Sequence, residues 1–65
     1  HDGELVRQLM ALPTRYRTVL YLYYFEGYST HEVADLLGVP DATVRTRLAR
    51  GRAKLKDVLD EGGTR

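Results

Sequence analysis

The 65-residue sequence contains no cysteine and no tryptophan, and it has only two prolines and one methionine. Without cysteine, the chain cannot be held together by a disulfide or by a thiolate zinc site. Its longest apolar stretch, Val19 to Phe25, is far too short to span a bilayer, so we expect no membrane contact. Stability must therefore come from packing of secondary structure, and an apolar content of 43% makes one small domain over residues 1–65 possible.

Net charge says little about function, but the distribution of charge says more. Ten Lys or Arg face nine Asp or Glu, which leaves a formal charge of +1. The basic residues are nevertheless concentrated: six Lys or Arg and no acid lie between Ala42 and Lys56. A basic helix flank is most often a solvated face, but a cluster of this kind is also typical of a nucleic-acid contact.

Residues 29–40 contain the signals of a short helix followed by a tight turn. Ser29 and Glu32 have the spacing of a capping box, in which each side chain bonds the backbone N–H of the other residue. Gly38 suits the left-handed position that ends a helix, and Pro40 cannot continue it. Val33, Leu36 and Leu37 would form the apolar face of this helix.

A second helix is predicted from Asp41 to about Leu59, with Asp41 at its positive end. An apolar stripe runs along one side: Val44, Leu48, Gly51, Leu55 and Leu59. The opposite side contains small, polar and basic residues: Ala42, Thr43, Thr46, Ala49, Arg50 and Ala53. A capped helix, a Gly-Pro turn and a basic second helix together predict a helix-turn-helix whose second helix can lie in a DNA major groove.

Two further helices are expected before this unit. Leu5, Val6, Leu9 and Leu12 have helical spacing and predict a helix from Asp2 to Ala11. Pro13 and Gly27 bracket a second, aromatic helix from Thr14 to Glu26. Its wide apolar face would consist of Tyr16, Val19, Leu20, Tyr23 and Tyr24. Clustered tyrosines can stack on single-stranded bases, but we favour core positions for Tyr16 and Tyr23 and exposure for Tyr21 and Tyr28.

Catalytic chemistry is not indicated anywhere in the chain. No Ser-His-Asp or Cys-His set, Gly-rich phosphate loop or carboxylate pair is present. His31 has no second ligand at helical spacing, so we expect no metal and assign it to the surface. The sequence predicts a protein that is not an enzyme and that needs no cofactor.

Several segments together resemble a known family. They are Leu12-Pro13, Arg15-Tyr16-Arg17, Glu26-Gly27-Tyr28-Ser29, Glu32-Val33-Ala34, Leu37-Gly38-Val39-Pro40 and Thr43-Val44-Arg45-Thr46-Arg47-Leu48, followed by Arg50 and Arg52. This pattern resembles region four, the C-terminal domain, of bacterial sigma factors of the extracytoplasmic-function group. It covers about residues 12–55, and the polar ends at residues 1–6 and 61–65 suggest a piece excised from a longer protein.

The resemblance implies an all-α domain of four helices, without winged elements, in the cytoplasm. Such a domain reads the double-stranded promoter −35 element while it is bound to RNA polymerase core through the β-subunit flap, and an anti-sigma factor is a further candidate partner. By this likeness, Arg45, Thr46, Ala49 and Arg50 face the groove, with Pro40 and Thr43 at its edge. Thr30 and His31 approach the DNA backbone, and Arg47 is added from the basic flank.

The sequence departs from the family pattern at two positions, and two alternative functions remain open. Gly51 stands where the family usually has alanine, and the small Ala49 could contact little more than a thymine methyl group. A response-regulator type of helix-turn-helix has a similar Thr-Val-Arg helix. A helical protein-interaction module, held by an anti-sigma factor, would suit the exposed tyrosines.

Overall fold

A computed structural model of the chain describes the backbone of residues 2–63 and the side chains of residues 3–56. The elements are α1 (Asp2–Met10), α2 (Thr14–Leu20), the π-helix η1 (Tyr21–Phe25), α3 (Thr30–Leu37) and α4 (Asp41–Gly63). The part of the chain that the structure describes contains no strand. The predicted all-α fold with four α-helices is confirmed.

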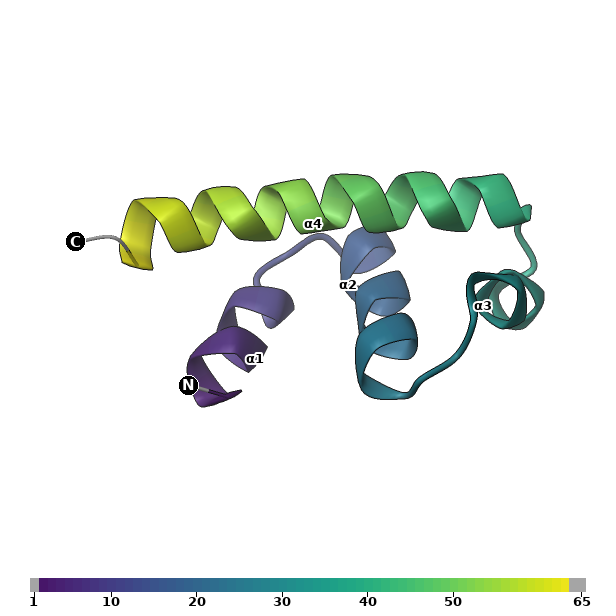
Figure 1. Cartoon of the computed structure of the whole chain (residues 1–65), viewed down its shortest axis with the longest axis horizontal. Helices are drawn as coiled ribbons and strands as arrows, with labels where there is room; N and C mark the ends of the chain where they lie inside the picture. The colour runs from purple at the N-terminus through teal and green to yellow at the C-terminus, as the bar shows by residue number, and fades with distance from the viewer. Residues whose placement is uncertain (1, 64–65) are drawn as a thin grey trace.

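The long helix α4 spans the molecule, and the other helices pack along one side of it (Figure 1). Helix α1 lies below the C-terminal half of α4, α2 crosses α4 near its middle, and α3 lies at its N-terminal end. The domain is accordingly elongated, with extents of 39 × 19 × 15 Å. This arrangement leaves the side of α4 that faces away from the other helices open to solvent.

The core is one small cluster to which every α-helix contributes. Val19, Val33 and Val44 are fully buried, one each from α2, α3 and α4. The cluster is completed by Leu9, Leu12, Tyr16, Leu20, Ala34 and Leu48. The predicted stripe of α4 is confirmed at Val44, Leu48 and Gly51, and Leu55 is half-buried. Leu59, the last member of that stripe, lies outside the side chains that the structure describes.

The predicted boundaries of α3 are confirmed in atomic detail. The Glu32 N–H donates to Ser29 Oγ at 3.1 Å, and the Ser29 N–H donates to Glu32 Oε1 at 2.8 Å. Both halves of the capping box are therefore formed. Gly38 ends the helix in the left-handed region at φ 70°, where a side chain would be strained.

The structure corrects several expectations of burial. Leu36 is 58% exposed, because α3 meets α4 through Val33, Ala34 and Leu37. Tyr24 is 52% exposed instead of in the apolar face, and Tyr23 is only half-buried. On α1, Leu5 and Val6 also lie at the surface.

The exposure of Tyr24 follows from the π-helix η1, which the sequence did not predict. The Glu26 N–H bonds the carbonyl of Tyr21, five residues earlier, so this turn is wider than an α turn. A wider turn changes the angle between successive side chains, and the aromatic side chains after Leu20 leave the 3.6-residue stripe. Helix α4 also extends to Gly63, beyond the expected end near Leu59.

Candidate nucleic-acid interface

The helix-turn-helix consists of α3, the turn at residues 38–40 and the N-terminal half of α4. Thr46, Ala49 and Arg50 are exposed on α4, as their helical phase predicts. Burial of Val44 and Leu48 fixes the rotation of α4, so these exposed side chains project away from the core. The capping box and the left-handed Gly38 set the direction of the turn between the two helices.

The residues expected near the DNA backbone lie at the start of α3 and in the turn. Thr30 is half-buried, whereas His31 and Pro40 are exposed. The His31 side chain is 81% exposed, and its Nε2 lies 3.9 Å from Asp35 Oδ2. These positions are open to a large partner, but the structure does not bring them into contact with the basic side chains of α4.

Arg45 differs from the other arginines of α4. Its guanidinium donates to the carboxylate of Asp41, one turn earlier on the same helix. The Arg45 side chain remains 60% exposed, so the ion pair is weak and can open. For Arg45 to contact a base edge, its ion pair with Asp41 would have to open, or both side chains would have to contact the base together.

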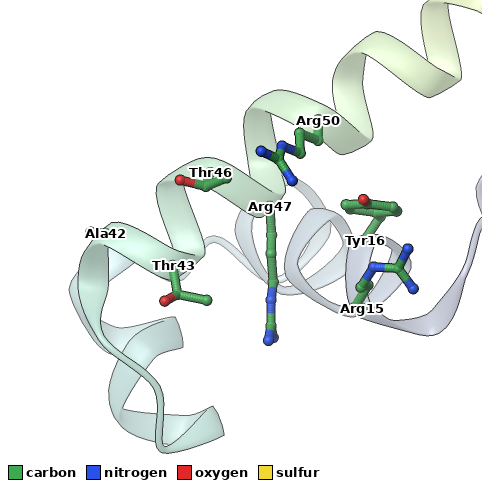
Figure 2. A pocket seen from close by; sticks show the side chains of 7 residues that line it. All are labelled: Arg15, Tyr16, Ala42, Thr43, Thr46, Arg47 and Arg50. Atoms are coloured by element: carbon green, nitrogen blue, oxygen red, sulfur yellow. The ribbon is translucent and has the colours of Figure 1, made fainter.

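A cationic hollow lies between α2 and α4, with a volume of about 320 Å³. It is lined by Arg15, Tyr16, Ala42, Thr43, Thr46, Arg47 and Arg50 (Figure 2). The structure thus brings together four of the predicted site residues, Thr43, Thr46, Arg47 and Arg50. Ala49 and Arg45 do not line it.

Three members of the hollow, Arg15, Tyr16 and Ala42, were not among the predicted site residues. Tyr16 is buried, as predicted, but one edge of it reaches the hollow. Arg15 Cζ lies 4.6 Å from the centroid of the Tyr16 ring, and Lys54 Nζ lies 5.7 Å from it. A hydrogen bond with Arg15, followed by the charges of Arg15, Lys54 and Arg50, lowers the pKa of the Tyr16 hydroxyl, against the opposing effect of burial.

The chain offers no arrangement for metal chemistry in the residues that the structure describes. No group of three or more His, Cys, Asp or Glu side chains is close enough to hold an ion there. In the same residues, no helix has the length and apolar character needed to cross a membrane.

Capped helix, left-handed turn and exposed basic second helix define a DNA-binding type of helix-turn-helix domain. The family model described as "Sigma-70, region 4" matches residues 2–55. The chain belongs to this family.

Relatives with known names agree with this assignment. The chain is 40% identical over 58 residues to the ECF RNA polymerase sigma factor SigW of Bacillus subtilis. This alignment covers 89% of the chain and 31% of SigW. It is 41% identical over 63 residues to the ECF factor SigE of Mycolicibacterium smegmatis, covering 91% of the chain and 24% of SigE. It is 42% identical over 53 residues to the ECF factor SigM of Mycobacterium tuberculosis, covering 82% of the chain and 27% of SigM. The chain therefore spans less than a third of each of these relatives.

Proposed function

We propose that this chain is the promoter-reading domain of an extracytoplasmic-function sigma factor and that α4 enters the major groove of a −35 element. The observation that carries the proposal is the exposed, acid-free face of α4 with Thr46, Ala49 and Arg50 at its centre. A helix fits the major groove, and arginine there can donate two hydrogen bonds to a guanine. The response-regulator and pure interaction-module readings are not favoured by the family match.

Each predicted site residue has a separate role in this proposal. Arg50 and Arg45 contact base edges, and Ala49 contacts no more than a thymine methyl group. Thr46 faces the groove beside Arg50, Pro40 and Thr43 lie at its edge, and Arg47 binds phosphate. Thr30 and His31, at the start of α3, contact the backbone on the other side.

Docking on RNA polymerase is the second part of the proposal. An apolar groove of about 200 Å³ lies between α1 and α2, lined by Leu9, Met10, Arg17, Thr18, Tyr21 and Leu22. Met10 is 57% exposed and Tyr21 is 45% exposed, so apolar surface is available to a partner. This groove is remote from the exposed face of α4, and it suits the β-subunit flap or an anti-sigma factor that competes with it. Both partners imply action in the cytoplasm.

Substitution of the groove arginines tests the promoter-reading proposal. Arg45→Ala and Arg50→Ala should each weaken binding to a −35 duplex, and at least one should relax base preference by about 1–3 kcal/mol. The measurement is fluorescence anisotropy with a set of single-base variants of the duplex. Arg7→Ala, on the exposed side of α1, removes the same charge and should leave base preference intact. Unchanged preference in both α4 variants would mean that these arginines hold phosphate only.

A further inference from the structure

Eight of the basic side chains that the structure describes fall into two groups by what they contact. Arg17 donates to the Met10 carbonyl and to Thr14, and Arg52 donates to the Tyr24 hydroxyl at 2.8 Å. Arg7 and Arg45 form ion pairs with carboxylates. A second group gathers around Tyr16 instead: Arg15, Arg47, Arg50 and Lys54.

No carboxylate neutralises this second group within the part of the chain that the structure describes. Arg7, His31 and Arg45, none of them in this group, each lie within ion-pair distance of a carboxylate there. Arg47, Arg50 and Lys54 have the i, i+3, i+7 spacing that places them along one side of α4, and Arg15 lines the same hollow as Arg47 and Arg50 from α2 (Figure 2). Three cations thus line one open hollow, and Lys54 lies over the Tyr16 ring beside them, which favours an anionic ligand.

Arg15 is held against Tyr16 more closely than Lys54, whose Nζ lies 5.7 Å from the same ring. Its guanidinium lies over the Tyr16 ring, and Tyr16 itself is anchored in the core with 6% exposure. Stacking on an aromatic face restricts a guanidinium without neutralising it. A restricted guanidinium can then donate two parallel hydrogen bonds to a phosphate at a smaller entropic cost.

We infer that Arg15, seated on Tyr16 and assisted by Lys54, binds a backbone phosphate of duplex DNA alongside the recognition helix. The inference rests on the proposed function, because it requires that Thr46 and Arg50 face the major groove. With α4 in that groove, the sugar-phosphate strands pass on either side of the helix. One strand then lies against the cationic hollow, whereas the start of α3 faces the other strand.

This contact differs in kind from those proposed for Arg45 and Arg50. Arg15 belongs to α2, outside the recognition helix, and reaches no base edge from the Tyr16 ring. A phosphate contact fixes how the protein sits on the duplex but carries no sequence information. Arg15 is therefore a positioning residue for the reading of bases by α4.

Substitution of Arg15 in the 65-residue chain tests the inference by fluorescence anisotropy over a range of salt concentrations. Arg15→Gln should weaken binding several-fold and equally on all duplexes, and the slope of log K against log salt should fall by about 1. Arg15→Lys should keep the slope and recover part of the affinity. Arg7→Gln makes the same change of charge on α1 and should keep the wild-type slope. Far-ultraviolet circular dichroism of each variant checks the fold.

Neutral linkages in the DNA test the same contact without relying on one protein variant. A duplex series would carry a single methylphosphonate at successive positions. At one position the neutral linkage should weaken the wild-type chain and have no additional effect on Arg15→Gln. Such a loss of additivity identifies two groups that interact directly.

The outcomes separate this inference from the function on which it rests. If Arg15→Gln binds as the wild type does while Arg50→Ala binds weakly, the phosphate contact is refuted and the promoter-reading proposal stands. A change of base preference in Arg15→Gln would place Arg15 on a base edge and also refute the phosphate contact. If the wild-type chain binds no duplex at any salt concentration, both proposals are wrong.

Discussion

Single side chains set where α3 begins and ends, and these boundaries were predictable from the sequence. Ser29, Glu32 and Gly38 act on the backbone within a few residues of themselves, so spacing alone is enough to identify them. The burial of Val33, Val44 and Leu48 was predictable for the same reason, because helical periodicity is local. Leu36 was not, since its exposure depends on which part of α3 meets α4.

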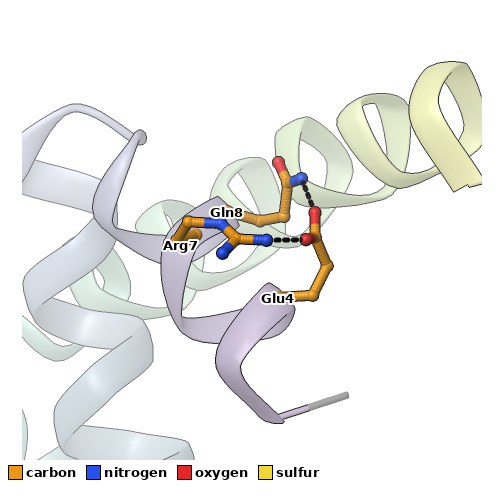
Figure 3. A network of polar contacts seen from close by, with 3 residues as sticks. All are labelled: Glu4, Arg7 and Gln8. Carbon is orange, nitrogen blue, oxygen red and sulfur yellow. Dashed lines mark hydrogen bonds and ion pairs between the residues drawn. The ribbon is translucent and has the colours of Figure 1, made fainter.

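Glu4 provides a prediction of pH dependence at this scale. Its carboxylate accepts hydrogen bonds from Gln8 and Arg7 on the next turn of α1 (Figure 3). The hydrogen bond from Gln8, followed by that from Arg7 and its charge, lowers the pKa of Glu4 in the folded state below the ordinary value. The stabilising contribution is therefore complete above the unfolded pKa of about 4.3 and is lost as pH falls through the lower folded pKa.

As pH falls through the folded pKa of Glu4, we expect α1 to become less well ordered. NMR titration of the Glu4 carboxyl carbon and of the α1 amides measures this change. In Glu4→Gln, which cannot titrate, this step should disappear while the rest of the acid transition remains. A Glu4 midpoint at or above the ordinary glutamate value would contradict the prediction. Because Glu4 is partly exposed, the effect on global stability should be small.

The close packing of α2 against α4 depends on a glycine in α4. Gly51 faces α2 at the crossing of the two helices, and a Cβ built there would lie 3.0 Å from Leu20 Cδ1 and 3.2 Å from Tyr16 Cβ. Glycine therefore permits the close approach that presents Tyr16 to the cationic hollow. The sequence marked Gly51 as unusual, but the reason lies in a helix that is distant in the chain.

Gly51→Ala should destabilise the domain by about 1 kcal/mol. Alanine gains up to about 1 kcal/mol in helix propensity, but overpacking costs roughly 1–3 kcal/mol, and the Tyr16 Cβ cannot move without its backbone. Urea unfolding measures the balance, with Ala53→Gly, at an exposed position, as the control for propensity alone. A Gly51→Ala variant more stable than the wild type would mean that α2 moves away from α4 easily.

At the scale of the whole molecule, the surfaces proposed for DNA and for polymerase lie on different sides of one small core. Arg15 and Arg50 line the cationic hollow, and Leu9 and Leu22 line the apolar groove, although the members of each pair are distant in the sequence. No periodicity could have predicted either juxtaposition, because both depend on how helices cross. The π-helix η1 was equally hidden, since nothing in its aromatic sequence distinguishes a wide turn from an α turn.

Separation of the two surfaces leads to a prediction about what the domain does alone. One recognition helix on a 65-residue chain offers few contacts, so the isolated domain should bind a −35 duplex weakly and with a steep dependence on salt.

Tethering through the apolar groove to polymerase raises the effective concentration of the domain at the promoter and should tighten binding without any new base contact. The measurement compares the isolated domain with a full-length factor in holoenzyme on the same duplex. Met10→Asp, which places a charge in the groove at an exposed position, should remove the gain from polymerase but leave the weak intrinsic binding unchanged. An inverted-repeat duplex serves as the contrasting substrate, because a dimeric response-regulator domain spans two half-sites. Tight, cooperative binding to that duplex in the absence of polymerase would reject the sigma-factor mechanism.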